Sequence, residues 1–295
     1  MTIRKTRADT MPNSFTLTFA CKDRPGIVSR VTTALLAIGG NIQDANHFND
    51  GTSGRFFCRI EFEVPAGVPK TSVEENVSAS LTPLDATWSV RGKDERMRVL
   101  IMASKLDHCL TDLLYRWRIG ELPMDIVGVV SNHPRDVYQH IDFGDIPFHH
   151  LPVTKDGKPE QEAKLLALVD EYRVELVVLA RYMQILSDEL AGRLEDRCIN
   201  IHHSFLPGFK GAKPYHQAHQ RGVKLIGATA HYVTGDLDEG PIIAQDVEQV
   251  SHRDAPEQLV RKGRDIERRV LARAVLYHIE GRVLRNGRTS VVFSD

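Results

Sequence analysis

The chain has 295 residues, which is long enough for two domains and a sizeable core. Hydrophobic residues make up 42% and charged residues 26%, as in ordinary globular proteins, and the formal net charge of -1 gives no electrostatic reason to expect a nucleic acid or an anionic membrane as partner. No apolar run approaches the roughly 20 residues of a membrane helix. We therefore expect a cytoplasmic protein.

The polar N-terminus and the distribution of the cysteines support this expectation. Residues 1–13 are polar and lack the apolar core of a signal peptide, so they are predicted to be disordered. The four cysteines are scattered and form no Cys-x-x-Cys pair. This distribution predicts buried, reduced thiols and argues against a zinc site.

Residues 14–90 are predicted to form a β-α-β-β-α-β domain of the ferredoxin-like kind. Apolar and polar residues alternate over 15–20 as in a half-buried strand, and Ile27, Val31 and Leu35 form one face of a helix. The remaining predicted elements are strands at 42–48 and 55–64, a helix at 71–81 and a strand at 87–90.

This first domain resembles the ACT family of regulatory modules. The resemblance is carried by residues 23–28, which read Asp-Arg-Pro-Gly-Ile-Val, and 39–42, which read Gly-Gly-Asn-Ile. It implies pairing through the sheets, hence a homo-oligomer, and an amino-acid effector bound near the first strand-to-helix loop. A purely architectural oligomerisation domain is the alternative, because a fold alone does not establish a ligand.

A charged linker at 91–96 precedes a second predicted domain, 97–295, of the α/β class. Apolar strands at 97–103, 126–130 and 174–180 alternate with helices at 106–117 and 161–172, and a long helix runs from 254–257 to about 280. This alternation predicts a Rossmann-like, mainly parallel sheet, in which ligands bind beyond the carboxyl ends of the strands. No Gly-x-Gly-x-x-Gly motif follows the first strand, which argues against a dinucleotide cofactor.

Three polar residues are the candidate catalytic groups of this domain. Asn200 and His202 are two residues apart where an apolar strand should end, so both side chains should point to one face. Asp238 lies in a loop after another apolar run. An amide, an imidazole and a carboxylate at strand ends suit acyl-group chemistry, in which donors stabilise an oxyanion and a second group moves a proton.

The amino-acid sequence around these residues resembles that of the formyltetrahydrofolate-using formyltransferase fold, and of formyltetrahydrofolate deformylases in particular. The matching segments are 199–207, 227–233 and 237–245, and the resemblance extends from about Met97 to the end. It implies that Asn200, His202 and Asp238 are catalytic. It also implies a folate pocket, for which the expected substrate-binding residues are Arg181, Met183, Gln184, Ile185, Leu186, His231 and Gly235.

The loop 104–108 departs from the formyltransferase pattern. Glycinamide ribonucleotide transformylases hold the acceptor phosphate in a Gly-Ser-Asn loop after the first strand, whereas this chain has Ser104-Lys-Leu-Asp107-His. Asp107 at a helix start would repel a phosphate. The resemblance thus implies that water is the acceptor and that 10-formyltetrahydrofolate is hydrolysed to formate and tetrahydrofolate, balancing one-carbon pools for purine biosynthesis, with the folate as substrate and no cofactor.

Two other functions remain open at this point: formyl transfer to an amine, and regulatory amino-acid binding with an inactive second domain. A metal site is not expected, because His203, His216 and His219 lie near one loop but lack a recognised ligand spacing. The sequence does not decide whether Lys105, Asp107 or His108 reaches the active site.

Overall fold

The computed structural model describes residues 13–154, 156–208 and 214–294, which fall into two compact units. The expected disordered segment lies outside the described residues, except for Asn13, which begins a strand. The first unit extends to Glu95 and also includes residues 280–286 and those from 291 onward; the second comprises Arg96–Ile279 and Gly287–Ser290.

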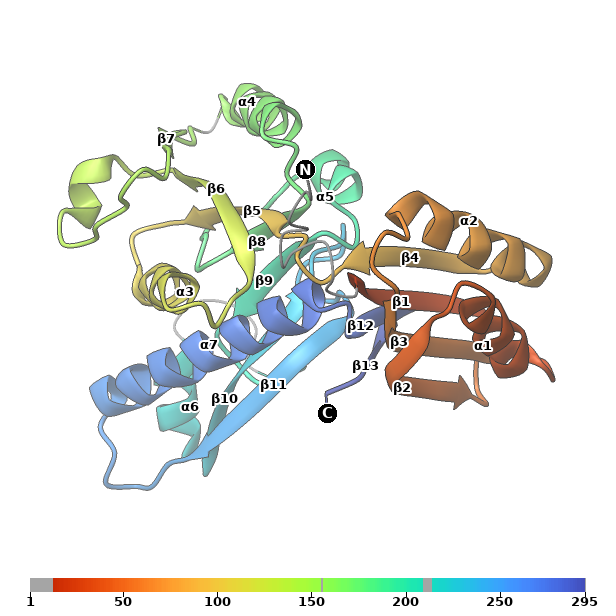
Figure 1. Ribbon diagram of the computed structural model, residues 1–295. Coiled ribbons are helices and arrows are strands. Elements are labelled where there is room, and N and C mark those ends of the chain that lie inside the picture. The colour runs from red at the N-terminus through yellow and green to blue at the C-terminus, as the bar shows by residue number, and fades with distance from the viewer. Residues whose placement is uncertain (1–12, 155, 209–213, 295) are drawn as a thin grey trace. The chain divides into compact units, whose positions relative to one another are not determined.

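The first unit contains an antiparallel four-stranded sheet in the order β2-β3-β1-β4. Two helices pack on it and complete the predicted β-α-β-β-α-β order (Figure 1). The elements are β1 (Asn13–Lys22), α1 (Ile27–Ala37), β2 (Asn41–Asp50), β3 (Arg55–Val64), α2 (Lys70–Leu81), the 3-10 helix η2 (Thr82–Leu84) and β4 (Thr87–Gly92). Strand β4 therefore includes the first two residues of the expected linker.

Alternation along β1 divides the apolar residues of this unit between two faces. Phe15, Leu17 and Phe19 point to the core that the helices cover. Ala20 points to the opposite face and packs with Phe57 and Leu284. Leu284 belongs to the two-stranded sheet of β12 (Val283–Asn286) and β13 (Thr289–Val292).

The chain thus returns to the first unit at its C-terminus, whereas the second domain was expected to continue to residue 295. Polar contacts support the return: Arg59 Nε donates to the Glu280 carbonyl at 3.1 Å, and Asn286 Nδ2 donates to Asp50 Oδ2 at 2.7 Å. The physical reason is that β3 and β1 expose apolar side chains on the face away from the helices, and the last strands cover them.

The second unit contains a seven-stranded sheet in the order β11-β10-β9-β8-β5-β6-β7. The five strands from β9 to β7 are parallel, and β10 and β11 are antiparallel to their neighbours. The strands are β5 (Met97–Ala103), β6 (Met124–Ser131), β7 (Phe148–His150), β8 (Leu176–Leu179), β9 (Cys198–His202), β10 (Leu225–Tyr232) and β11 (Ile242–Gln249).

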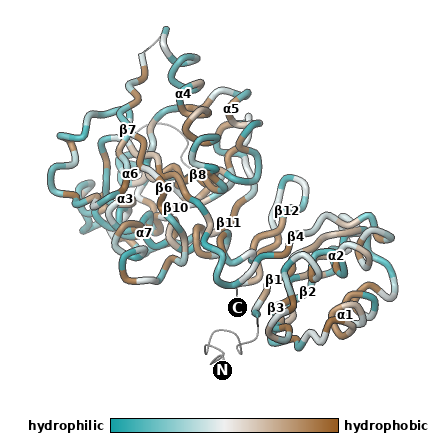
Figure 2. Tube along the Cα trace, turned by 45° about the horizontal axis from the view of Figure 1, so that its top comes forward, coloured by the Kyte–Doolittle hydropathy of each residue, from teal (hydrophilic) through white to brown (hydrophobic). Residues whose placement is uncertain are grey.

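Helices cover both faces of this sheet, as the alternation of strands and helices predicted (Figure 1). Helices α4 and α5 pack on the face to which Leu100 and Met102 point, and α3 and α7 lie together on the other. Hydrophobic residues are concentrated in the strands between them (Figure 2). The helices are α3 (His108–Arg118), η3 (Arg135–Tyr138), α4 (Lys158–Glu171), α5 (Asp188–Arg193), α6 (Pro214–Arg221) and α7 (Pro256–Ile279).

The sequence pattern did not predict β7, α5, α6 or the C-terminal strands, all of which are short. No helix among the described residues is long and apolar enough to cross a membrane.

Helix α6 packs closely against α7 at Gly263. A Cβ atom at Gly263 would lie 2.1 Å from Cζ of Tyr215. We predict that Gly263→Ala lowers the free energy of unfolding by about 1–3 kcal/mol, because overpacking outweighs the gain in helix propensity. Gly192→Ala is the control, since nothing lies within 4 Å of its added Cβ. Urea unfolding measures both, and equal stability of the two variants would contradict the expected clash.

Candidate active site

Asn200 and His202 lie on β9, an interior strand of the large sheet between β8 and β10. Parallel pairing aligns Leu179 of β8 with Asn200, and antiparallel pairing aligns His231 of β10 with Asn200. Asn200 Nδ2 and His231 Nε2 are 3.4 Å apart. His231, which the sequence analysis expected to bind substrate, thus lies beside the amide because of strand register.

Asp238 reaches this pair from the loop between β10 and β11. Its Oδ2 lies 3.2 Å from His202 Nδ1, and its Oδ1 lies 3.6 Å from His231 Nε2. The structure therefore brings together all three expected catalytic residues, with His231 as a fourth member. One carboxylate spans two imidazoles on neighbouring strands.

The loop can approach the strands closely because of its backbone. Asp238 has a positive φ of 58°, and a Cβ atom at Gly240 would lie 1.8 Å from the carbonyl oxygen of Tyr232. Tyr232 also donates its backbone N–H to the Pro241 carbonyl at 2.9 Å. Only glycine fits at position 240, so this residue lets the loop fold back and deliver Asp238.

Asp238 is held in its ionised form. Burial by itself would raise the pKa of this carboxyl group, but hydrogen bonds from His202 and His231 outweigh burial and hold the pKa well below its usual range. A carboxylate with a lowered pKa loses its charge only as the pH falls through that low value. Asp238 is therefore charged throughout the neutral range.

His202 has one occupied and one open ring nitrogen. Nδ1 faces Asp238, whereas Nε2 is buried and has no hydrogen-bond partner among the described residues. The ring borders a cavity of about 220 Å³. A bound molecule could therefore exchange a hydrogen bond or a proton with Nε2 while Asp238 fixes the other side of the ring.

The cavity has one polar end and apolar walls. Asn200, His202, His231 and Asp238 form the polar end. The remaining lining comes from the loop 181–186, from the β10–β11 loop and from neighbouring strand residues: Val233, Thr234, Gly235, Leu237, Leu179, Ile201 and His203. Met183, Ile185 and Leu237 are more than half exposed although apolar, with relative exposures of 53%, 61% and 57%. Exposed apolar side chains around a cavity suit a flat aromatic ligand.

Every expected substrate-binding residue borders this cavity: Arg181, Met183, Gln184, Ile185, Leu186, His231 and Gly235. Arg181 differs from the others, because its side chain is buried and its guanidinium contacts Glu267 and His203.

Residues that sequence reasoning missed fix the 181–187 loop in place. Ser104 Oγ accepts the backbone N–H of Met183 at 2.9 Å, and Ser104 N–H donates to the Arg181 carbonyl at 3.3 Å. Ser187 donates its backbone N–H and its hydroxyl to Glu162 on α4. A serine directly after β5 was visible in the sequence, but its partners are 79 residues away along the chain.

In the loop 104–108, which distinguishes this chain from phosphate-binding transformylases, Asp107 and His108 pair with residues outside the loop. Asp107 Oδ2 lies 2.5 Å from His140 Nε2, and His108 contacts Glu267. Lys105 is exposed and does not border the cavity. Within the described residues, this loop therefore presents neither a free cation nor a glycine-lined nest to the cavity.

Comparison with known proteins agrees with this geometry. Residues 97–275 match the formyl transferase family. The chain is 49% identical to formyltetrahydrofolate deformylase of Corynebacterium sp. (strain P-1), over 94% of this chain and 96% of that protein. It belongs to the formyltetrahydrofolate deformylase family. The Bacillus subtilis (strain 168) deformylase is 48% identical over 94% of this chain and 93% of its own length.

Among solved structures, this chain is more similar to a deformylase than to a transformylase. The formyltetrahydrofolate deformylase of Burkholderia mallei superimposes with a TM-score of 0.90 at 50% identity, covering 96% of this chain and all of that one. Glycinamide ribonucleotide transformylase 1 of Symbiobacterium toebii gives 0.63 at 29% identity, covering 68% of this chain and 96% of that one. The likeness to deformylases therefore includes the first unit.

Replacement of Asp238 by Asn tests the carboxylate. We predict that Asp238→Asn lowers the turnover of the deformylase reaction at least ~10²-fold, because proton transfer by a positioned group contributes typically 10²–10⁴-fold. Folate binding should change little, since the replacement keeps the size of the side chain. Steady-state formate release and folate titration measure the two effects. Asp236→Asn is the matched control two residues away, outside the cavity lining, and similar turnover in both variants would rule out a catalytic Asp238.

Proposed function

We propose that this protein hydrolyses 10-formyltetrahydrofolate to formate and tetrahydrofolate. The observation that carries the proposal is that a chain with full-length likeness to deformylases places Asn200, His202 and Asp238 at one end of a cavity. The apolar walls of the cavity match the flat pterin of a folate. The residues proposed to hold the folate are the loop 181–186, His231 and Gly235, partly through backbone groups of the loop.

The reaction requires attack of water on the formyl carbon and departure of the folate nitrogen. In the proposed mechanism, Asn200 Nδ2 donates to the formyl oxygen as it becomes an oxyanion. Asp238 is ionised and holds both the attacking water and Nδ1 of His202. The proton released by water reaches the leaving nitrogen through His202 Nε2, which is unpaired within the described chain. The carbon–nitrogen bond then breaks to give formate and tetrahydrofolate.

This set of side chains can perform the reaction without a resident cofactor, because the amide supplies oxyanion stabilisation and the imidazole–carboxylate pair supplies proton transfer. The product formate would support purine biosynthesis, and hydrolysis would balance the one-carbon folate pools. We also propose a cytoplasmic, homo-oligomeric protein, on the basis of its composition and of the sheet pairing expected for an ACT-like unit.

Transfer to a phosphorylated amine is the competing function, because the second unit resembles glycinamide ribonucleotide transformylase. The loop 104–108 favours hydrolysis. Its acidic Asp107 lies at the start of α3 and pairs with His140. A phosphate would otherwise bind at this helix N-terminus.

We predict that the purified protein releases formate from 10-formyltetrahydrofolate without any added amine. Adding glycinamide ribonucleotide should leave the rate of formate release unchanged and should yield no formylated nucleotide, because Asp107 repels the phosphate. Formate and nucleotide products are quantified from the same reaction. Formylated nucleotide appearing as fast as formate would establish transfer in place of hydrolysis.

The first unit is proposed to bind an amino-acid effector. A hollow beside the N-terminus of α1 is bordered by Arg24, Gly26, Ser29 and Arg30, with Asn76 of α2 opposite. A helix N-terminus and two arginines suit a carboxylate. Such an effector would alter hydrolysis only if it binds two states of the protein unequally.

We predict that one or more amino acids bind full-length protein and change its rate of formate release, and that Arg30→Ala abolishes the response. Arg253→Ala is the control, because Arg253 is exposed and lies in the other unit. Calorimetric titration and formate release are measured with a panel of the twenty amino acids. If none of them binds, the first unit has the purely architectural role.

A further inference from the structure

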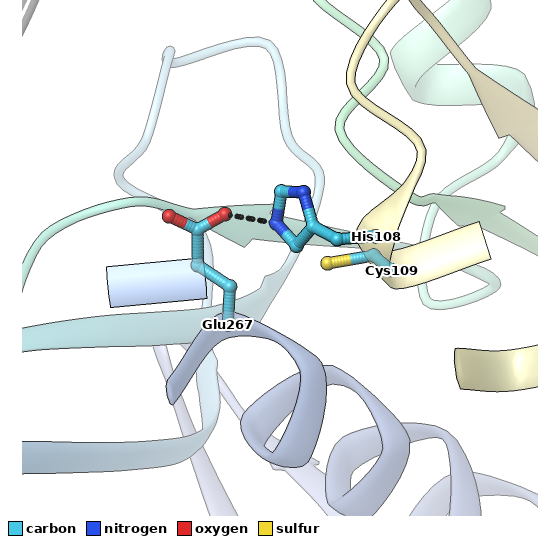
Figure 3. Close-up of side chains that lie close together, drawn as sticks. All are labelled: His108, Cys109 and Glu267. Carbon is cyan, nitrogen blue, oxygen red and sulfur yellow. Dashed lines mark hydrogen bonds and ion pairs between the residues drawn. The ribbon is translucent and has the colours of Figure 1, made fainter. Parts of the chain in front are cut away.

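A buried carboxylate lies behind the active site without a role in the proposed reaction. Glu267 on α7 is 1% exposed. Its Oε2 lies 2.8 Å from His108 Nε2 and 3.3 Å from Arg181 Nε, and its Oε1 accepts a hydrogen bond from Tyr215 at 2.6 Å. Figure 3 shows the carboxylate of Glu267 pointing toward the ring of His108, with Cys109 beside it. Burial of a charge at this depth requires a compensating partner.

A metal ion is one conceivable partner, because ligand atoms of His108, Cys109 and Glu267 lie within 4.8 Å of one another. The surrounding charges favour a different explanation. Arg181 already places a permanent positive charge beside Glu267, and burial raises the pKa of the Cys109 thiol well above its ordinary value. An additional cation would be repelled by Arg181, and the thiol would have to ionise in an apolar environment.

Arg181 connects this carboxylate to the active site. The residue has a positive φ of 63°, and its side chain is 8% exposed. Its NH1 group contacts Nδ1 of His203. Because a guanidinium group can only donate, His203 Nδ1 must accept with its lone pair. The contact therefore selects the uncharged imidazole with its proton on Nε2.

His203 in turn lies against the catalytic imidazole. The rings of His203 and His202 are stacked with centroids 5.0 Å apart and planes inclined by 20°. Burial, the charge of Arg181 and the adjacent His202 lower the pKa of His203 to about 4. A proton on His203 would place a positive charge against His202 as well as against Arg181.

We infer that Arg181, oriented by Glu267, is a positioning residue that holds His203 as an uncharged imidazole against His202. This inference rests on the proposed function for its catalytic consequence. A proton that enters the stacked pair then goes to His202, whose Nδ1 faces Asp238. Proton transfer is thereby confined to His202, which lies on the same strand as Asn200.

The charged and titratable groups around His203 come from several elements. Its electrostatic neighbours are Arg181 after β8, His202 on β9, Asp238 in the β10–β11 loop and Glu267 on α7. Tyr215 of α6 lies 6.5 Å away, centroid to centroid. The two carboxylates favour protonation of His203, and Arg181, His202 and burial oppose it more strongly. Removing Arg181 together with Glu267 eliminates one opposing and one favouring charge, but it also removes the N–H donor that blocks Nδ1.

The direct test is a nitrogen NMR titration of histidine-labelled, full-length protein. In the wild-type protein, His203 should keep the Nε2–H tautomer and remain uncharged above pH 5. In Arg181→Met/Glu267→Gln, which removes both buried charges together, its pKa should rise above the wild-type value of about 4, because Nδ1 loses the donor that blocks it. It should stay below the ordinary histidine pKa of about 6.5, because burial and His202 still oppose the charge. The signal is assigned by its absence from His203→Asn, which keeps an acceptor for Arg181. Wild-type protonation near pH 6.5 would overturn the inference, as would an unchanged His203 pKa in a folded double variant.

The pH dependence of formate release provides the functional test. A raised pKa charges a larger fraction of His203 at low pH, so kcat of the double variant should fall further than that of wild type between about pH 8 and 5.5, by the fraction of His203 that the titration shows to be charged. Adding His203→Asn to the double variant should remove this extra fall. A raised KM with unchanged kcat would instead limit Arg181 to the folate-binding role proposed for its loop and would overturn the positioning role.

The two tests separate the inference from the proposed function. If the wild-type protein releases no formate, the proposed function fails, while the tautomer of His203 still decides the arrangement of Arg181 and His203. If the double variant does not fold, the wild-type titration alone decides. The pH dependence of the free energy of unfolding is a further check. Unfolded His203 binds a proton near pH 6.5 and folded His203 near pH 4, so the stability of the wild-type protein should decline as the pH falls through this interval.

Discussion

The ionised carboxylate of Asp238 is the group on which the rest of the candidate active site depends. It must be partly removed from water and yet keep its charge, which is unfavourable without hydrogen bonds. His202 and His231 satisfy this requirement, and they can do so only because β9 and β10 are paired in the register that places His231 opposite Asn200. The close return of the loop at Gly240 completes the arrangement. A slip of one residue would turn His231 to the other face of the sheet and leave the carboxylate without one partner.

Two buried charge systems meet at the stacked pair of His202 and His203. On the cavity side, Asp238 is paired with His202. On the side of α7, Glu267 is paired with Arg181, which contacts His203. Adjacent imidazoles are expected to compete for a proton, so opposite surroundings for the two rings give each a distinct state. The apolar core on both faces of the sheet supports this separation by lowering the local dielectric constant around the buried groups.

Much of the architecture followed from local pattern. The apolar runs of β5 and β6 predicted buried parallel strands, and the spacing of Ile27, Val31 and Leu35 predicted the helix α1. The C-terminal strands were missed although Asn286-Gly287 is a turn signal between them. Their destination could not have been predicted, because the apolar face formed by Ala20 and Phe57 exists only once β1 and β3 have paired.

The sequence by itself, through its resemblance to the formyltransferase fold, indicated the class of chemistry. Asn200 and His202 two residues apart at a strand end, followed by an acidic loop at 238, indicate oxyanion stabilisation and proton transfer, and the spacing of two in a strand fixes their common face. Only the tertiary structure decided how these groups are oriented and charged. Glu267 and Arg181 are separated from each other by more than eighty residues of chain, and no periodicity links them. Their pairing arises because α7 packs against β9 and β10 and brings Glu267 to the loop that follows β8, and burial there makes a charge-balancing partner obligatory.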